Sequence, residues 1–87
     1  MIPMASSKVE AKYYPHLRKM GLNLAYYRKF KDLTQEALAE KANVSRTTIA
    51  DFEITADYSG ISLGTIFKLA DALEIPVKKL FDFRDED

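Results

Sequence analysis

Two short helical patterns separated by a tight turn constrain the fold of this chain more than any other feature. Thr34 and Ser45 each precede one of the two patterns, and both residue types are preferred at helix N-caps. Asn43 lies between the patterns, and asparagine is the non-glycine residue that best adopts the left-handed conformation that ends a helix. The spacing therefore predicts helices over 35–41 and 46–53.

The residues between and within these helices match the demands of a helix-turn-helix arrangement. Ala39 supplies the small side chain needed where the two helices approach each other. Val44, Ile49 and Phe52 are spaced to face inward, so they would anchor the second helix and leave its other face free. We expect that free face to carry the function.

Apolar residues at helical spacing predict three further helices. One covers 16–31, another covers 63–73 behind the N-cap Ser62, and a short fifth helix starts at Pro76. Residues 54–61 have the composition of a loop, and no segment shows the alternation of a strand. The sequence therefore predicts an all-α fold of five helices.

The predicted helices group into one domain with two flanking segments. The helix-turn-helix domain covers 16–83, an N-terminal arm covers 1–15, and a charged, acidic tail covers 84–87. Leu80, Phe81 and Phe83 make the fifth helix apolar, so it either folds onto the core or pairs with a second copy of the chain across a two-fold axis, and we favour the pairing. Tyr26, Tyr27 and Phe30 are interpreted as core and flanking aromatics rather than as a partner surface.

Composition excludes several classes of function. The chain has no cysteine and one histidine, His16, so we expect no metal site. It has no glycine-rich phosphate loop and no nucleophile elbow, so we expect neither an enzyme nor a cofactor. It also has no apolar run long enough to cross a bilayer and no signal-peptide core, so a cytoplasmic protein without a membrane partner is expected.

Charge is distributed unevenly although the formal net charge is zero. Residues 1–31 carry a net charge of +6, residues 32–62 carry −4 and residues 63–87 carry −2. Such asymmetry predicts one positive face on the molecule. It does not identify the partner of that face.

The stretch LTQEALAEKANVSRTTI, which runs from Leu33 to Ile49, resembles the helix-turn-helix of phage-repressor and Cro-like (XRE-family) transcription regulators. The similarity covers about residues 22–82. It implies a five-helix, lambda-repressor-like DNA-binding domain that acts as a homodimer on double-stranded DNA, with the recognition helix 46–53 in the major groove. On this basis we expect a sequence-specific DNA-binding regulator, most simply a repressor.

The resemblance also assigns individual residues. Gln35 falls where the family meets a phosphate or base at the edge of the groove, and Ser45 and Thr48 fall near the DNA backbone. Arg46, Thr47 and Asp51 fall where the family reads base edges, which suits an arginine that can bond guanine and a threonine methyl that can touch thymine. Two further residues, Arg28 and Glu53, occupy positions that form a structural ion pair in similar repressors.

One departure from the family keeps an alternative open. The loop 54–61 contains Asp57 but no basic residue, so it lacks an expected phosphate contact, and we expect weaker DNA binding. Lys8 and Lys12 of the arm are alternative sources of positive charge. The missing basic loop slightly favours the second hypothesis, in which the same fold is a protein-interaction module such as the antitoxin of a toxin pair.

Overall fold

A computed structural model describes residues 10–55 and 61–83, and within these ranges the chain is helical without any strand. It contains four α-helices: α1 (Tyr14–Phe30), α2 (Gln35–Ala42), α3 (Arg46–Ala50) and α4 (Leu63–Leu73). Three shorter turns complete the described residues: the 3-10 helix η2 (Ala11–Tyr13), the π-helical turn η3 (Asp51–Thr55) and the 3-10 helix η4 (Val77–Phe81). The predicted all-α class is therefore correct.

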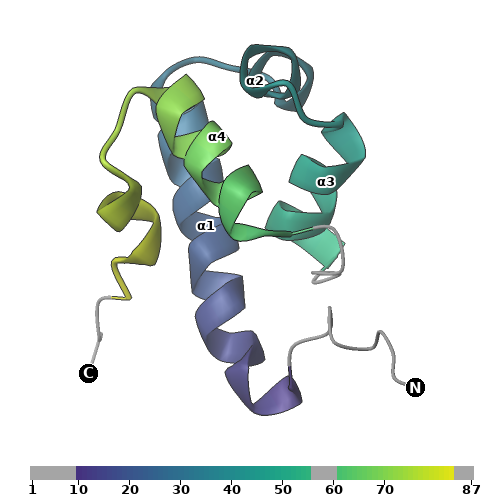
Figure 1. The fold of residues 1–87 in the computed structure, drawn as a ribbon, viewed down its shortest axis with the longest axis vertical. Helices are drawn as coiled ribbons and strands as arrows, with labels where there is room; N and C mark the ends of the chain where they lie inside the picture. The colour runs from purple at the N-terminus through teal and green to yellow at the C-terminus, as the bar shows by residue number, and fades with distance from the viewer. Residues whose placement is uncertain (1–9, 56–60, 84–87) are drawn as a thin grey trace.

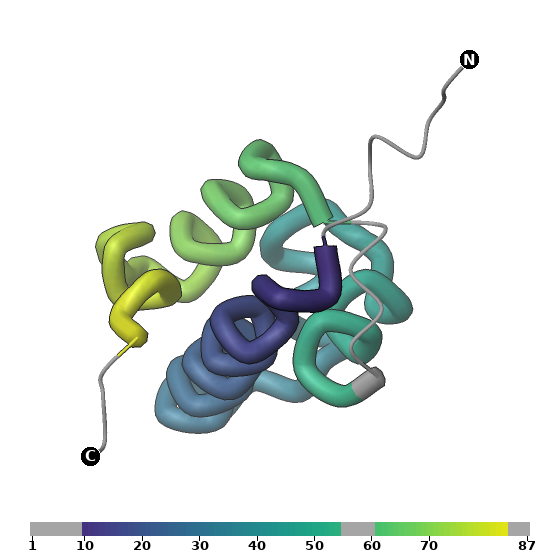
Figure 2. The backbone as a smooth tube through the Cα atoms, turned by 90° about the horizontal axis from the view of Figure 1, so that it is seen from below, coloured from purple at the N-terminus to yellow at the C-terminus, as the bar shows by residue number. Residues whose placement is uncertain are grey.

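Helix α1 runs through the middle of the molecule, between η3 and η4. It contacts η3 on one flank and η4 on the other, while α2 packs against both α3 and α4 (Figures 1 and 2). In Figure 1, α2 lies at the top of the molecule, with α3 on the opposite side from η4. The arrangement keeps α3 at the edge of the molecule, attached to the remainder through α2 and η3.

Side-chain caps fix where the helices begin. The side chains of Thr34, Ser45 and Ser62 accept hydrogen bonds from the backbone N–H groups three residues later, at the starts of α2, α3 and α4. Asn43 ends α2 in the left-handed conformation, with φ 59° and ψ 47°. These caps were predicted and are confirmed, and helix 63–73 has the predicted bounds.

The N-terminal part of the fold begins earlier than predicted. Helix α1 starts at Tyr14, two residues before the predicted start, and η2 precedes it directly. Pro15 lies in the first turn of α1, where a missing N–H costs nothing because that donor has no partner within the helix. Of the predicted arm 1–15, residues 1–9 lie outside the described residues, as does the tail 84–87.

The predicted helix 46–53 is wrong in form. Regular α-helix ends at Ala50, and the chain continues as the π-helical turn η3 to Thr55. Helical geometry therefore enters the predicted loop 54–61, of which residues 56–60 lie outside the described residues. The turn carries Phe52 into the core and Glu53 against α1.

The short fifth helix predicted to start at Pro76 is the 3-10 helix η4, not an α-helix, and it starts at Val77. Pro76 precedes it in an extended conformation, with ψ 141°, which proline permits and an α-helix does not. Leu80 is fully buried, Phe83 packs against the core and Phe81 is exposed. Of the two alternatives for this segment, Leu80 supports packing onto the core.

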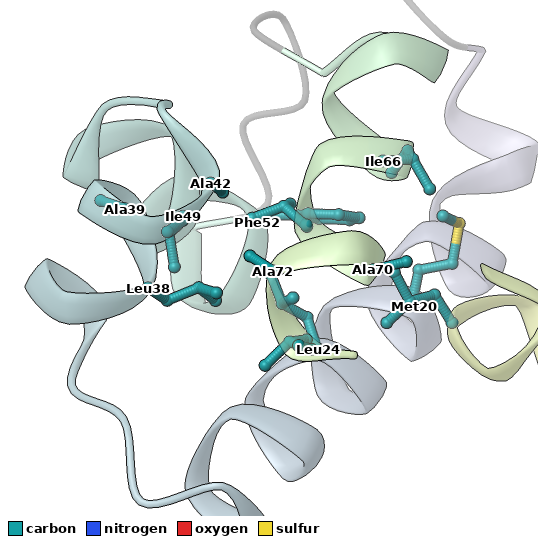
Figure 3. Close-up of a cluster of buried hydrophobic side chains, with 13 residues drawn as sticks. Met20, Leu24, Leu38, Ala39, Ala42, Ile49, Phe52, Ile66, Ala70 and Ala72 are labelled. Atoms are coloured by element: carbon teal, nitrogen blue, oxygen red, sulfur yellow. The ribbon is translucent and has the colours of Figure 1, made fainter. Parts of the chain in front are cut away.

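A single cluster of apolar side chains joins all four α-helices, η3 and η4 (Figure 3). Burial of this apolar surface stabilises the fold and orients α2 and α3 relative to α1. The cluster consists of Met20, Leu24, Leu38, Ala39, Ala42, Ile49, Phe52, Ile66, Leu69, Ala70, Ala72, Leu73 and Leu80.

Candidate nucleic-acid interface

Helices α2 and α3 are held together by a short turn and a few buried side chains. The backbone N–H of Val44 donates to the carbonyl oxygen of Ala39 at 3.0 Å, which closes the turn after Asn43. Ala39 and Ile49 are buried where the two helices pack. The second helix is thus anchored on its inner side, as the sequence pattern predicts.

The outer side of α3 is open to solvent among the residues that the structure describes. Ser45, Arg46 and Thr47 are exposed, and Thr48 and Asp51 are half-buried. Ser45 and Thr48 are engaged with each other, because the Ser45 Oγ accepts from the Thr48 backbone N–H at 3.0 Å and lies 2.8 Å from the Thr48 Oγ1. Their hydroxyl groups stabilise the start of α3, so Arg46 and Thr47 are the side chains best presented at this end.

Arg46 contacts the start of α2. Its Nη1 donates to the Oε1 of Gln35 at 3.4 Å, and its Nε lies 4.0 Å from the Oε2 of Glu36. The side chain is nevertheless about half exposed, at 51%. The contact with Glu36 was not predicted, although Glu36 adjoins Gln35 at the end of α2 that faces α3.

Gln35 also connects this surface to the interior. Its Nε2 donates to the Oε1 of Glu53 at 3.0 Å. Glu53 in turn receives two hydrogen bonds from Arg28, from Nε at 2.8 Å and from Nη2 at 3.0 Å. A continuous row of polar contacts therefore runs from Arg28 on α1 to Arg46 on α3.

The Arg28–Glu53 ion pair is buried, and each of its side chains makes a further hydrogen bond. The Arg28 Nη1 donates to the carbonyl oxygen of Leu33 at 2.8 Å, so the pair also fixes the chain at the start of the motif. The hydrogen bonds to Glu53 raise the pKa of the Arg28 guanidinium above its ordinary value, although burial acts in the opposite direction. The pair ties α1, η3 and the segment before α2 into one unit.

Comparison with known proteins agrees with this geometry. The sequence model of the helix-turn-helix family matches residues 24–80. The chain belongs to the helix-turn-helix family of phage-repressor and Cro-like regulators. It is also 39% identical over 68 residues to a protein of Methanocaldococcus jannaschii named as an uncharacterized HTH-type transcriptional regulator, and the match covers 78% of this chain and all of that protein.

Family membership makes α2 and α3 the two helices of the helix-turn-helix. The structure places Gln35, Ser45, Arg46, Thr47 and Thr48 around the adjoining starts of these helices, whereas Asp51 lies farther along, in the first position of η3. Among residues 10–55 and 61–83, no group of acidic or histidine side chains is arranged to hold a metal ion. In the same ranges, no helix has the length and apolar character required to cross a membrane.

Proposed function

We propose that this helix-turn-helix protein is a sequence-specific DNA-binding transcriptional regulator that acts as a repressor. In this proposal, the recognition segment 46–53, formed by α3 and the first half of η3, enters the major groove of double-stranded DNA. The supporting observation is that Arg46 and Thr47 are exposed at the start of a helix whose inner side is anchored in the core. Neither match to known proteins supports the alternative of an antitoxin-like interaction module.

Residue roles follow from the position and chemistry of each side chain. Arg46 would donate to a guanine, and the Thr47 methyl group would touch a thymine methyl. Asp51 would accept from a cytosine amino group. Gln35, Ser45 and Thr48 would bind at the DNA backbone near the edge of the groove, where contacts fix orientation rather than specificity.

Electrostatics around α3 limit the affinity we expect. Glu36 lies beside Arg46 and would approach the phosphates together with it, so the local positive charge is partly cancelled. Phosphate contacts dominate the affinity and salt dependence of protein–DNA binding. We therefore expect modest affinity in which base contacts contribute a large share.

We further propose a homodimer that reads two half-sites. Leu63 and Phe67 lie one helical turn apart on α4 and are 69% and 56% exposed. Exposed side chains of opposite charge, Lys68 and Asp71, flank them on the same helix, so two copies of this face would meet without net repulsion. We assign the dimer contact to Leu63 and Phe67.

Selection of bound duplexes from a random pool tests this function directly. The expected result is a site of two symmetry-related halves, about 10–10.5 base pairs apart or a multiple of that spacing. The Arg46→Ala chain is the matched control, and it should enrich a site that has lost preference at one position in each half. Failure to enrich any sequence, together with salt-independent or absent DNA binding, would remove the DNA-binding proposal.

A further inference from the structure

Helix α1 carries an apolar stripe that the fold leaves uncovered among the described residues. Leu22, Tyr26 and Phe30 lie four residues apart, on one face of the helix, and are 60%, 61% and 68% exposed. The rings of Tyr26 and Phe30 are stacked, with centroids 6.3 Å apart and planes 13° apart. The interpretation of these aromatics as core-flanking is therefore wrong for Tyr26 and Phe30, and it is correct for Tyr27, which packs against the core.

A groove runs beside this α1 stripe, between α1 and η4. Its volume is about 410 Å³, and it is lined by Leu22, Asn23, Tyr26, Tyr27, Lys79 and Asp82. Asn23 fixes the two walls relative to each other, because its Nδ2 donates to the carbonyl oxygens of Leu80 at 3.1 Å and Asp82 at 3.2 Å. The groove is thus a preformed feature with an apolar side and a polar side.

The charges around the groove are mainly positive. Arg18 and Lys29 are exposed on α1 within one turn of the stripe, and Lys79 lines the opposite wall. The buried pair Arg28–Glu53 and the exposed pairs Lys41–Glu74 and Arg46–Glu36 do not involve these three cations. The acidic residue in the lining is Asp82. A second copy of this face would bring like charges together, whereas an acidic partner would be attracted.

The stripe lies away from the proposed DNA-binding side. Gly21 faces η3 at the backbone of Phe52, and Arg28 faces η3 through Glu53. Helical spacing puts Leu22, Tyr26 and Phe30 on the other side of α1, and η3 and η4 flank α1 on different sides (Figure 2). Occupation of the groove is therefore compatible with DNA held by α3.

We propose that the α1 stripe and its groove bind an acidic amphipathic helix of a partner protein. The apolar side chains of that helix would pack on Leu22, Tyr26 and Phe30, which span about 12 Å along α1 and match two turns of a partner helix. Its carboxylates would lie against Arg18, Lys29 and Lys79. This inference goes beyond DNA binding and does not depend on it.

A designed peptide tests the proposal on the full chain. The probe is a fluorescein-labelled helical peptide with Leu and Phe at i, i+4 and i+7 and Glu at the flanking positions. Fluorescence anisotropy should show saturable binding that weakens as salt is added. The substitutions Tyr26→Ala and Phe30→Ala should each weaken binding by about tenfold, and Lys79→Glu should also weaken it. Ile54→Ala, at an apolar position on η3 that is 66% exposed, should leave peptide binding unchanged.

Several outcomes would overturn the proposal. If a peptide with Lys in place of Glu binds as tightly as the Glu peptide, the surface does not select an acidic partner. If Tyr26→Ala and Phe30→Ala bind the peptide as tightly as the unchanged chain does, the stripe is not the binding surface. Self-association that disappears in Tyr26→Ala would identify a second copy as the occupant, and peptide binding that requires removal of residues 84–87 would identify the chain's own acidic end. Because these side chains are exposed, each variant should keep the fold. Circular dichroism of each variant checks this, so that lost peptide binding can be told apart from lost folding.

Discussion

Arg28 and Glu53 form a two-point ion pair across α1 and η3, with nitrogen–oxygen distances of 2.8 Å and 3.0 Å. The Glu53 side chain is 3% exposed and the Arg28 side chain 11%, so neither charge is well hydrated. Removing one partner leaves the other charge buried and unpaired. We expect Arg28→Ala or Glu53→Ala to lower the free energy of unfolding by about 3–5 kcal/mol, measured by urea denaturation.

Lys41→Ala is the matched control for that measurement. It breaks the Lys41–Glu74 pair, whose atoms are 3.9 Å apart and whose side chains are 48% and 75% exposed, so its cost should be no more than about 1 kcal/mol. Because the pKa of Arg28 is raised, its stabilisation is present below the ordinary arginine pKa and is lost only in strong alkali. Equal losses for Arg28→Ala and Lys41→Ala would contradict a structural role for the buried pair.

The second prediction compares two glycines. A Cβ at Gly21 would overlap the carbonyl oxygen of Phe52, whereas a Cβ at Gly64 would meet only the Ser62 Oγ at 3.7 Å. Gly21→Ala should therefore destabilise the fold, by about 1–3 kcal/mol, because backbone must move. Gly64→Ala should cost nothing and gain up to about 1 kcal/mol from helix propensity. Thermal melts compare the two, and a stabilised Gly21→Ala chain would show that α1 and η3 are not in close contact.

The third prediction concerns the proposed dimer. A carboxylate at Leu63 or Phe67 would be placed in the contact that we assign between two copies, so Leu63→Glu and Phe67→Glu should shift the chain to monomer in sedimentation velocity. Both side chains are exposed in the single chain, so its fold should persist. Phe30→Glu is the control, and it should leave the dimer intact. If Phe30→Glu alone dissociates the dimer, the two copies meet through α1 instead.

Local signals were sufficient to predict where α2, α3 and α4 begin and where α4 ends. Thr34, Ser45 and Ser62 cap the helices that they precede, and Asn43 ends α2 as its residue type indicates. Each of these signals acts within a few residues, so it can be identified in the sequence without knowledge of the tertiary structure. The exposure of Arg46 and Thr47 could likewise be predicted, because the inward side of their helix is identified by its apolar residues.

Features that depend on contacts between distant segments could not be predicted in the same way. The π-helical turn η3 lies where Phe52 meets Gly21, which is 31 residues earlier in the sequence. Whether Leu80 faces the core depends on the path of the chain after Pro76. In the candidate site, the contact of Glu36 with Arg46 depends on how the turn orients α2 against α3.

The fourth prediction tests base reading by Arg46. Arg46→Ala should weaken binding to the selected site by about 1–3 kcal/mol and relax the preference at one base position. Lys68→Ala removes one positive charge from the exposed side of α4. Any loss of DNA affinity that it causes should therefore be the same for the selected site and for its single-base variants. Mobility-shift titrations on the selected site and its single-base variants separate the two effects. Unchanged discrimination in Arg46→Ala would show that α3 does not read bases through this residue.

The last prediction is that Gln35 positions Arg46. Gln35 accepts a hydrogen bond from Arg46 at 3.4 Å and donates one to Glu53 at 3.0 Å. Glu53 is itself held by a hydrogen bond from Arg28. A double-mutant cycle of Gln35→Ala and Arg46→Ala, measured as DNA-binding free energy, should therefore show a coupling of about 0.5–3 kcal/mol. Stability should fall little in Gln35→Ala, because Glu53 keeps both hydrogen bonds from Arg28. Strictly additive losses would mean that Gln35 and Arg46 meet the DNA independently, and that their contact in the free protein does not orient the arginine.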